Sequence, residues 1–157
     1  MNKLMRLGFS ALSVIVLCSE AKAQGFTIAG IEAKLFYSNS GRLSANIIGN
    51  PKIVLHNVVI GEGTVDGPSE STLLIVRVQG PARSSLEGML LRITATAPED
   101  TLADREIEVG SMNSAGNYYA ACWLDDTGCA PVDVEARLSV GKDSRRAKAH
   151  IPFECSE

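Results

Sequence analysis

The feature that most constrains the fold of this chain is an alternation of apolar and polar residues with a period of two. The clearest example is Val132–Val140, where every second residue is apolar and the residues between are Asp, Glu, Arg and Ser. Successive side chains of a β-strand point to opposite faces of its sheet. The segment is therefore predicted to be a strand with one buried and one hydrated face.

Similar segments recur along the chain, separated by Gly, Pro, Asn, Asp and Ser. The predicted strands are 25–37, 42–48, 53–60, 72–79, 90–97, 105–109, 118–124, 132–140 and 145–153. Apart from one turn of helix at 84–89, no later segment has helical spacing of apolar residues. The expected fold is all-β, an antiparallel two-sheet β-sandwich of immunoglobulin-like arrangement. A C2-like sandwich, a jelly roll and an eight-stranded barrel have the same sequence signature.

The first 23 residues have a different character. A cationic start precedes an apolar run from Leu7 to Leu17, and Ala21-Lys22-Ala23 ends the segment. This pattern is typical of a secretory signal peptide cleaved before Gln24, which leaves 24–157 as a single domain. A retained membrane anchor is disfavoured because the apolar run is shorter than the roughly 20 residues that cross a bilayer. A lipoprotein acylated at Cys18 is disfavoured because Leu17 stands where a small residue is needed.

Charge and size narrow the class of protein further. Cleavage removes three of the 15 basic and one of the 18 acidic residues, so the mature chain has a formal net charge of -5. That balance disfavours nucleic acid as a partner, because phosphate binding requires a basic surface. A mature chain of this length buries about two thirds of its unfolded surface, which suits one core without a structural metal.

Three cysteines remain after cleavage. Cys122 and Cys129 flank an Asp-Asp-Thr-Gly turn, so a hairpin there would place the two sulfurs opposite one another. A Cys122–Cys129 disulfide is the prediction, with Cys155 as the unpaired thiol. The alternative is a Cys129–Cys155 bond, which alternation disfavours unless a bulge near Pro131 or Pro152 changes the facing of one cysteine.

The predicted hairpin also assigns the aromatic residues of 118–124 to faces. Bridging Cys122 to Cys129 aligns Tyr119 with Val132 of the following strand, whose apolar face is inward. Tyr119 and Trp123 are then expected in the core and Tyr118 at the surface.

A contact surface is predicted from this exposed tyrosine and from the basic residues of the last strand. Its members are Tyr118, Arg145, Arg146, Lys148 and His150. Basic side chains on an edge strand commonly prevent edge-to-edge association, which is the simpler interpretation. The sharper one is a surface complementary to a charged partner.

No catalytic, metal-ligating or cofactor-binding residues are predicted. The chain lacks the Gly-x-Ser-x-Gly of a nucleophile elbow, and the glycines at 61, 63 and 67 lack the Lys-Ser/Thr ending of a phosphate loop. Two scattered histidines, His56 and His150, offer no preorganised metal pair. The acidic turns lack the regular carboxylate spacing of a calcium loop.

The expected function is that of an exported, non-catalytic binding or accessory module of the bacterial envelope, periplasmic or secreted. Its expected partner is another envelope or secreted protein, with no nucleic acid, no cofactor and no membrane anchor after cleavage. The alternative from another class is a small periplasmic metal or redox carrier that uses Cys155 with a histidine or with the hairpin cysteines.

Overall fold

The structure is a computed structural model that describes residues 25–50, 52, 55, 69 and 71–154. The signal segment, most of the predicted strand 53–60, His56 and Cys155 lie outside the described residues. The described residues form strands and turns and contain no helix. The strands are β1 (Thr27–Tyr37), β2 (Arg42–Leu43), β3 (Ser71–Gln79), β4 (Leu90–Thr96), β5 (Thr101–Glu108), β6 (Asn117–Asp125), β7 (Val132–Val140) and β8 (Asp143–Ile151).

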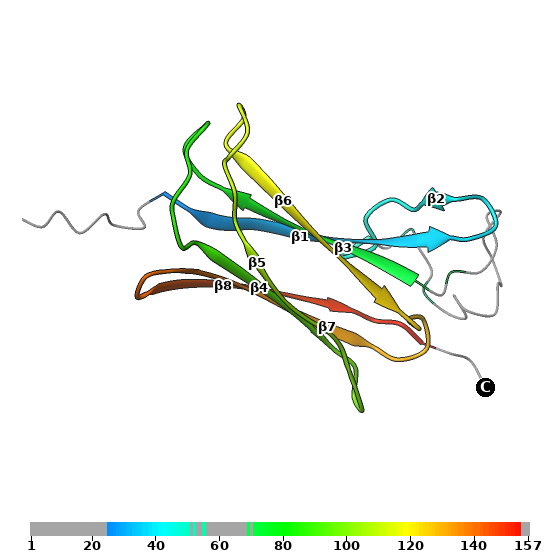
Figure 1. The fold of residues 1–157 in the computed structure, drawn as a ribbon. Coiled ribbons are helices and arrows are strands. Elements are labelled where there is room, and N and C mark those ends of the chain that lie inside the picture. The colour runs from blue at the N-terminus through cyan, green and yellow to red at the C-terminus, as the bar shows by residue number, and fades with distance from the viewer. Residues whose placement is uncertain (1–24, 51, 53–54, 56–68, 70, 155–157) are drawn as a thin grey trace, which may run out of the picture.

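These strands make a sandwich of two four-stranded sheets, which confirms the predicted fold class (Figure 1). The first sheet has the order β2-β1-β3-β6 and the second β5-β4-β7-β8, and all neighbouring strands are antiparallel. The chain changes sheet between β3 and β4, between β5 and β6, and between β6 and β7. Strands 1, 3 and 6 thus face strands 4, 7 and 8 as in immunoglobulin-like sandwiches, with β5 added beside β4.

The core lies between the sheets and is built from the alternating apolar residues of each strand. In β3 the side chains of Leu74, Val76 and Val78 are fully buried, and in β4 those of Leu91 and Ile93 are too. Burying one such side chain stabilises the fold by about 1.5–3 kcal/mol. Every second residue is likewise buried along most of β7, which confirms the alternation predicted for 132–140.

Most strand boundaries differ from the prediction by one or two residues, and two differ by more. β5 begins at Thr101 rather than at residue 105, because Ala97 and Asp100 exchange backbone hydrogen bonds of 2.8 and 3.3 Å in a tight hairpin. Only Arg42–Leu43 of the predicted strand 42–48 has strand geometry.

After β2 the chain still follows β1, but side chains replace part of the ladder. The backbone N–H of Leu35 donates to the Ser44 hydroxyl, and the N–H of Ala33 donates to Asn46 Oδ1, both at 2.9 Å. The N–H of Ile47 donates to the carbonyl of Ala33 at 2.8 Å. Ser and Asn compete in this way with regular ladders, so this edge of β1 is covered without a full strand.

The predicted hairpin between 118–124 and 132–140 does not form. β6 pairs with β3, whereas β7 pairs with β4 and β8 in the other sheet. The β3–β6 register places Cys122 opposite Leu74, and both side chains are buried. The prediction that Tyr119 and Trp123 point into the core is therefore wrong, since both lie on the outer side of β6.

Two glycines fix the start of β6 against the end of β3. The N–H of Gly80 donates to the carbonyl of Gly116 at 2.9 Å. Gly116 has a φ of +74°, and a Cβ added there would lie 2.4 Å from the carbonyl oxygen of Gly80. Position 116 therefore requires glycine both for its backbone angle and for the close approach.

Candidate functional site

The two sheets present outer faces of opposite chemical character. The outer side of the first sheet has an apolar cluster, called here the aromatic face, beside the ion pair of Lys34 and Glu32 on β1. Its residues are Phe36, Leu43, Leu73, Ile75, Tyr119, Ala121 and Trp123. The outer side of the second sheet, called here the charged face, consists mainly of ionic and polar side chains. Its residues include Arg92, Asp104, Asp133, Glu135, Arg137, Arg146, Lys148 and His150.

The aromatic face leaves large rings in contact with solvent. Trp123 is 50% exposed and Tyr119 is 54% exposed, and both belong to β6. Phe36 of β1 meets Trp123 edge to face, with ring centroids 5.5 Å apart and an interplanar angle of 78°. Leu73 of β3 lies directly opposite Trp123 in the β3–β6 register. Side chains from three strands thus make one continuous apolar surface.

Charged groups stand at opposite ends of this surface. Arg77 lies opposite Tyr119 near one end of β6, and its side chain is exposed. At the other end the hydroxyl of Ser71 donates to Asp125 Oδ1 at 3.3 Å. The aromatic face therefore has charged groups at both ends and the Lys34–Glu32 ion pair along its β1 side, an apolar core with a polar rim that is typical of protein interfaces.

The charged face is organised by cross-strand ion pairs. Arg92 of β4 holds Asp104 of β5 with two hydrogen bonds, one of them 2.7 Å from Nε to Oδ1. The hydrogen bond from Arg92 lowers the pKa of Asp104, and Asp104 in turn raises the pKa of Arg92. Both groups keep their charge, so each satisfies the other at the surface.

Acidic residues of β7 pair with basic residues of β8. The carboxylate of Glu135 lies 3.3 Å from Lys148 Nζ and 3.9 Å from Arg146 Nε. Asp133 Oδ1 lies 2.8 Å from His150 Nδ1. Arg146 and Lys148 of the basic strand thus share one carboxylate of β7, and His150 contacts another.

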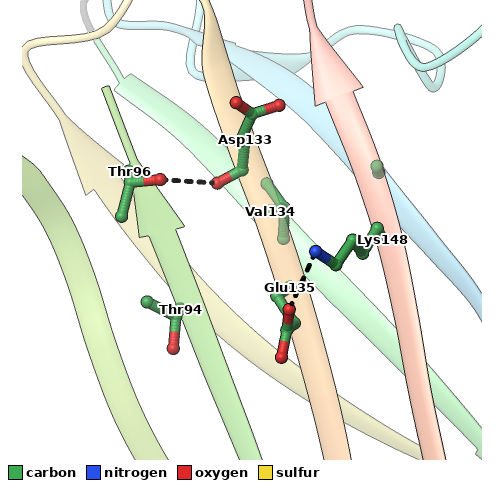
Figure 2. Close-up of a pocket in the computed structure, with 7 residues that line it drawn as sticks. Thr94, Thr96, Asp133, Val134, Glu135 and Lys148 are labelled. Carbon is green, nitrogen blue, oxygen red and sulfur yellow. Dashed lines mark hydrogen bonds and ion pairs between the residues drawn. The ribbon is translucent and has the colours of Figure 1, made fainter. Parts of the chain in front are cut away.

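A depression of about 500 Å³ lies over β4, β7 and β8 on this face (Figure 2). Thr94, Thr96, Asp133, Glu135 and Lys148 line it, as Figure 2 shows. The Thr96 hydroxyl donates to the backbone carbonyl of Asp133 at 3.5 Å, and Lys148 is paired with Glu135. The charged side chains at the depression are held by protein partners, so they offer a ligand little that is unpaired.

The structure does not bring the predicted contact residues together. Tyr118 is half-buried against the core, with its hydroxyl 3.5 Å from the carbonyl of Glu108, so its predicted exposure is wrong. It belongs to β6 at one edge of the first sheet, whereas β8 is the edge of the second sheet away from β5. The structure places the basic members of the predicted surface as follows: Arg146, Lys148 and His150 on the charged face, and Arg145 on the alternate side of β8.

The cysteines also differ from the prediction. Cys122 is a free thiol, 5% exposed, between the sheets. Burial raises the pKa of the Cys122 thiol, and the guanidinium of Arg105 offsets part of the rise. Cys129 is disulfide-bonded, and its partner is not among the described residues. The Cys122–Cys129 disulfide is therefore wrong, because the strands on either side of the loop that holds Cys129, β6 and β7, lie in different sheets and form no hairpin.

The metal or redox carrier remains a prediction because Cys155 and His56 lie outside the described residues. Within the described residues no three His, Cys, Asp or Glu side chains gather as a metal site would require. The same residues include no helix long and apolar enough to span a membrane.

The aromatic face was missed by the sequence analysis, although one signal for it was present. The strand 72–79 carries Leu73 and Ile75 between its core residues, so it is apolar on both faces over that stretch. A strand buried on both faces is expected to be apolar at consecutive positions. Leu73 and Ile75 thus indicate that the outer side of β3 is also suited to being covered.

Comparisons with known proteins add little. No protein-family model matches the chain, and no curated protein is similar to it. Among solved structures, the chain is similar to part of a β-glucuronidase of Bifidobacterium dentium in complex with coumarin-3-O-glucuronide, with a TM-score of 0.42 and 10% identity. The match covers 82% of this chain and 17% of that enzyme, so this chain spans only a small part of its length. At this TM-score the likeness supports no conclusion about function.

Proposed function

We propose that the protein is an exported, non-catalytic binding module of the bacterial envelope that docks another exported protein on its aromatic face. The charged face serves solubility. The amino-terminal segment supports export, since its cationic start, apolar run and Ala21-Lys22-Ala23 end are those of a signal peptide.

One observation carries the proposal: Trp123 and Tyr119, on the edge strand β6, are half exposed beside the apolar side chains of β3. Scattered surface apolar residues are ordinary, but a contiguous apolar patch with polar ends marks an interaction site. Trp and Tyr are also the residues that contribute most to binding energy at protein interfaces. Phe36 holds Trp123 in place, so little side-chain freedom remains to be lost on binding.

The kind of partner follows from the chemistry of the face. The face is a sheet surface with Leu73, Ile75 and Trp123 side by side, and such an exposed apolar sheet surface suits another protein better than a small polar ligand. Arg77 and Asp125 at its two ends offer charges of both signs that orient such a partner.

Site-specific photo-crosslinking in the native envelope tests this proposal. A photoreactive phenylalanine in place of Ile75 lies on the aromatic face, and the same group in place of Arg137 lies on the charged face. The expected result is a protein adduct from position 75 that is absent from position 137. Equal adducts from both positions, or none from position 75, would contradict the proposal.

Cell fractionation tests the export part separately. The mature protein is expected outside the cytoplasm with Gln24 as its first residue. Full-length protein in the cytoplasm with the leader intact would overturn this part.

A further inference from the structure

The four edges of the sandwich differ in how well they resist pairing with another strand. The β2 edge is only two residues long, and the part of β1 beyond it carries a β-bulge between Ile28 and Gly30. The other sheet ends in two charged strands. β5 carries Asp104, Arg105, Glu106 and Glu108, and β8 carries Arg145, Arg146 and Lys148. Short strands, bulges and charges are the usual protection of an edge.

β6 has none of this protection. It is nine residues long, and from Asn117 to Leu124 it contains no charged residue. In the part of the chain that the structure describes, no strand lies beyond it in the sheet. Every second residue of an edge strand directs its N–H and C=O away from its sheet, so β6 presents a free ladder.

We infer that β6 pairs antiparallel with β6 of a second copy of this chain, around a twofold axis at Ala121. The inference rests on the proposed function in that it joins two aromatic faces side by side into one larger binding surface. The resulting dimer has a continuous sheet of eight strands made from the two first sheets.

The size pattern of β6 argues for a second copy rather than a strand of another protein. From Tyr118 to Leu124 the residues read large, large, small, small, small, large, large. The pattern is symmetric about Ala121, so the strand is its own complement when it is reversed. A strand that received an unrelated partner would need no such symmetry, whereas a twofold interface requires self-complementarity.

The register follows from this symmetry. Ala121 lies opposite Ala121 of the second copy, and Tyr119 lies opposite Trp123 of the second copy on the outer face. Directly opposite Cβ atoms are about 4.5–5.5 Å apart, a distance at which aromatic cross-strand pairs interact. The two small central residues let the strands approach, and the two aromatic pairs flank them.

The position of the charged residue of β6 is compatible with the same register. Asp125 is the one charged residue of β6 and stands at its end. Antiparallel pairing places Asp125 opposite Asn117 of the second copy, so the two carboxylates are at opposite ends of the interface. It also turns the Asp125 end of one aromatic face toward the Arg77 end of the other.

Analytical ultracentrifugation of the mature protein tests the inference. We expect a dimer that is lost in Ala121→Lys and in Ala121→Glu, because each variant sets two like charges directly opposite one another. Mixing the two variants is expected to restore a dimer that contains one copy of each. Thr101→Lys is the control, since it adds the same charge at an exposed position of the β5 edge and should leave the dimer intact.

Two further readouts keep the test decisive. Circular dichroism of each variant shows whether the sandwich has folded, and only folded variants count. Trp123 is the chain's one tryptophan, so its fluorescence is expected to change with dilution of the natural protein and not of Ala121→Lys. A natural protein that is monomeric up to its solubility limit, or a dimer unaffected by Ala121→Lys, would overturn the inference.

Failure of the inference is distinguishable from failure of the proposed function. The photo-crosslinking probe at position 75 is repeated in the Ala121→Lys background. A heterologous adduct from a protein that is monomeric when purified would support the binding function and overturn the dimer. Loss of that adduct in Ala121→Lys, with the purified protein monomeric, would assign the β6 edge to a strand of the other protein and also overturn the dimer. A dimer without any adduct would overturn the binding function alone.

Discussion

The two outer faces of this sandwich have opposite chemistry although the sheets beneath them are built alike. On the charged face, side chains of opposite charge pair across neighbouring strands, Asp104 with Arg92 and Glu135 with Lys148. The aromatic face leaves Trp123 and Tyr119 half exposed. The inner positions of each strand are dictated by the core, and the alternate positions are free to differ. The difference between the two faces therefore points to interaction rather than to folding.

The comparison depends on which side chains of β6 point into the core. Substitutions of two neighbouring residues of β6 test this most directly. Leu124 is fully buried, whereas its neighbour Trp123 is half exposed. Leu124→Ala is expected to lower the free energy of unfolding by about 2–5 kcal/mol. Trp123→Ala is expected to lower it by less, because half of the Trp123 side chain is already exposed to solvent in the folded protein. Urea denaturation of both variants checks this, and the opposite order would place Trp123 in the core and remove the aromatic face.

The cysteines offer a second way to break the comparison, because a Cys122–Cys129 bond would turn Trp123 inward. Cys122 is free and Cys129 is disulfide-bonded, so we predict that Cys155, the third cysteine outside the predicted signal peptide, is the partner of Cys129. Peptide mapping without reduction is expected to yield a Cys129–Cys155 link. Cys155→Ser is expected to lower the free energy of unfolding by about 2–4 kcal/mol, as for other disulfides that close loops of this size.

Alkylation of the Cys122 thiol is a second test of which side of β6 faces the core. Burial raises the pKa of Cys122, so the folded protein is expected to react with iodoacetamide only slowly at neutral pH. Denaturant should expose the thiol and allow rapid labelling. Fast labelling of the folded protein at Cys122 would contradict the inward facing of this side of β6.

The charged face should contribute far less to stability. Glu135→Gln removes the pairs with Lys148 and Arg146, whose side chains are mostly exposed. The expected loss is about 0.2–1 kcal/mol, and it should shrink in high salt because exposed pairs are screened. Thermal denaturation at low and high salt measures both effects. A large, salt-insensitive loss would show that this face is more than a solvated surface.

The smallest expected effect is a pH dependence at Asp104. Its pKa is lowered by the hydrogen bond from Arg92, so its contribution to stability is present above the ordinary carboxyl pKa. That contribution is lost as the pH falls through the lowered pKa of the folded protein. The difference in unfolding free energy between the natural protein and Asp104→Asn is therefore expected to shrink as the solution is acidified. The same Asp104→Asn change in an Arg92→Gln background, where the hydrogen bond is absent, is the control and should show a weaker trend.

Alternation in the sequence was sufficient to predict the sandwich and the inner faces of β3, β4 and β7. Alternation was insufficient for β6, because Asn117–Asp125 has no charged residue before its last position that would identify the solvent-facing side of the strand. Its facing was assigned from a hairpin that does not exist. β6 lies beside β3, where Cys122 is opposite Leu74. This pairing joins residues far apart in the sequence, so the spacing of residues along the chain does not predict it.

The candidate site was less predictable than the fold for the same reason. The basic residues of β8 were visible in the sequence, but their pairing with Asp133 and Glu135 depends on the β7–β8 register. The aromatic face joins Phe36, Leu73 and Trp123, which are distant in sequence and meet only through two strand pairings. A surface assembled from single residues of several strands leaves no local motif.

The backbone contact between Gly80 and Gly116 has a consequence for how this surface can change. This contact, at the point where β6 enters the sheet, is made by main-chain atoms and involves none of the outward side chains from Tyr119 to Trp123. Substitutions at the outward positions of β6 should therefore change the chemistry of the aromatic face while the path of the β6 backbone stays the same. Different binding surfaces can therefore arise at these positions without a change in the fold.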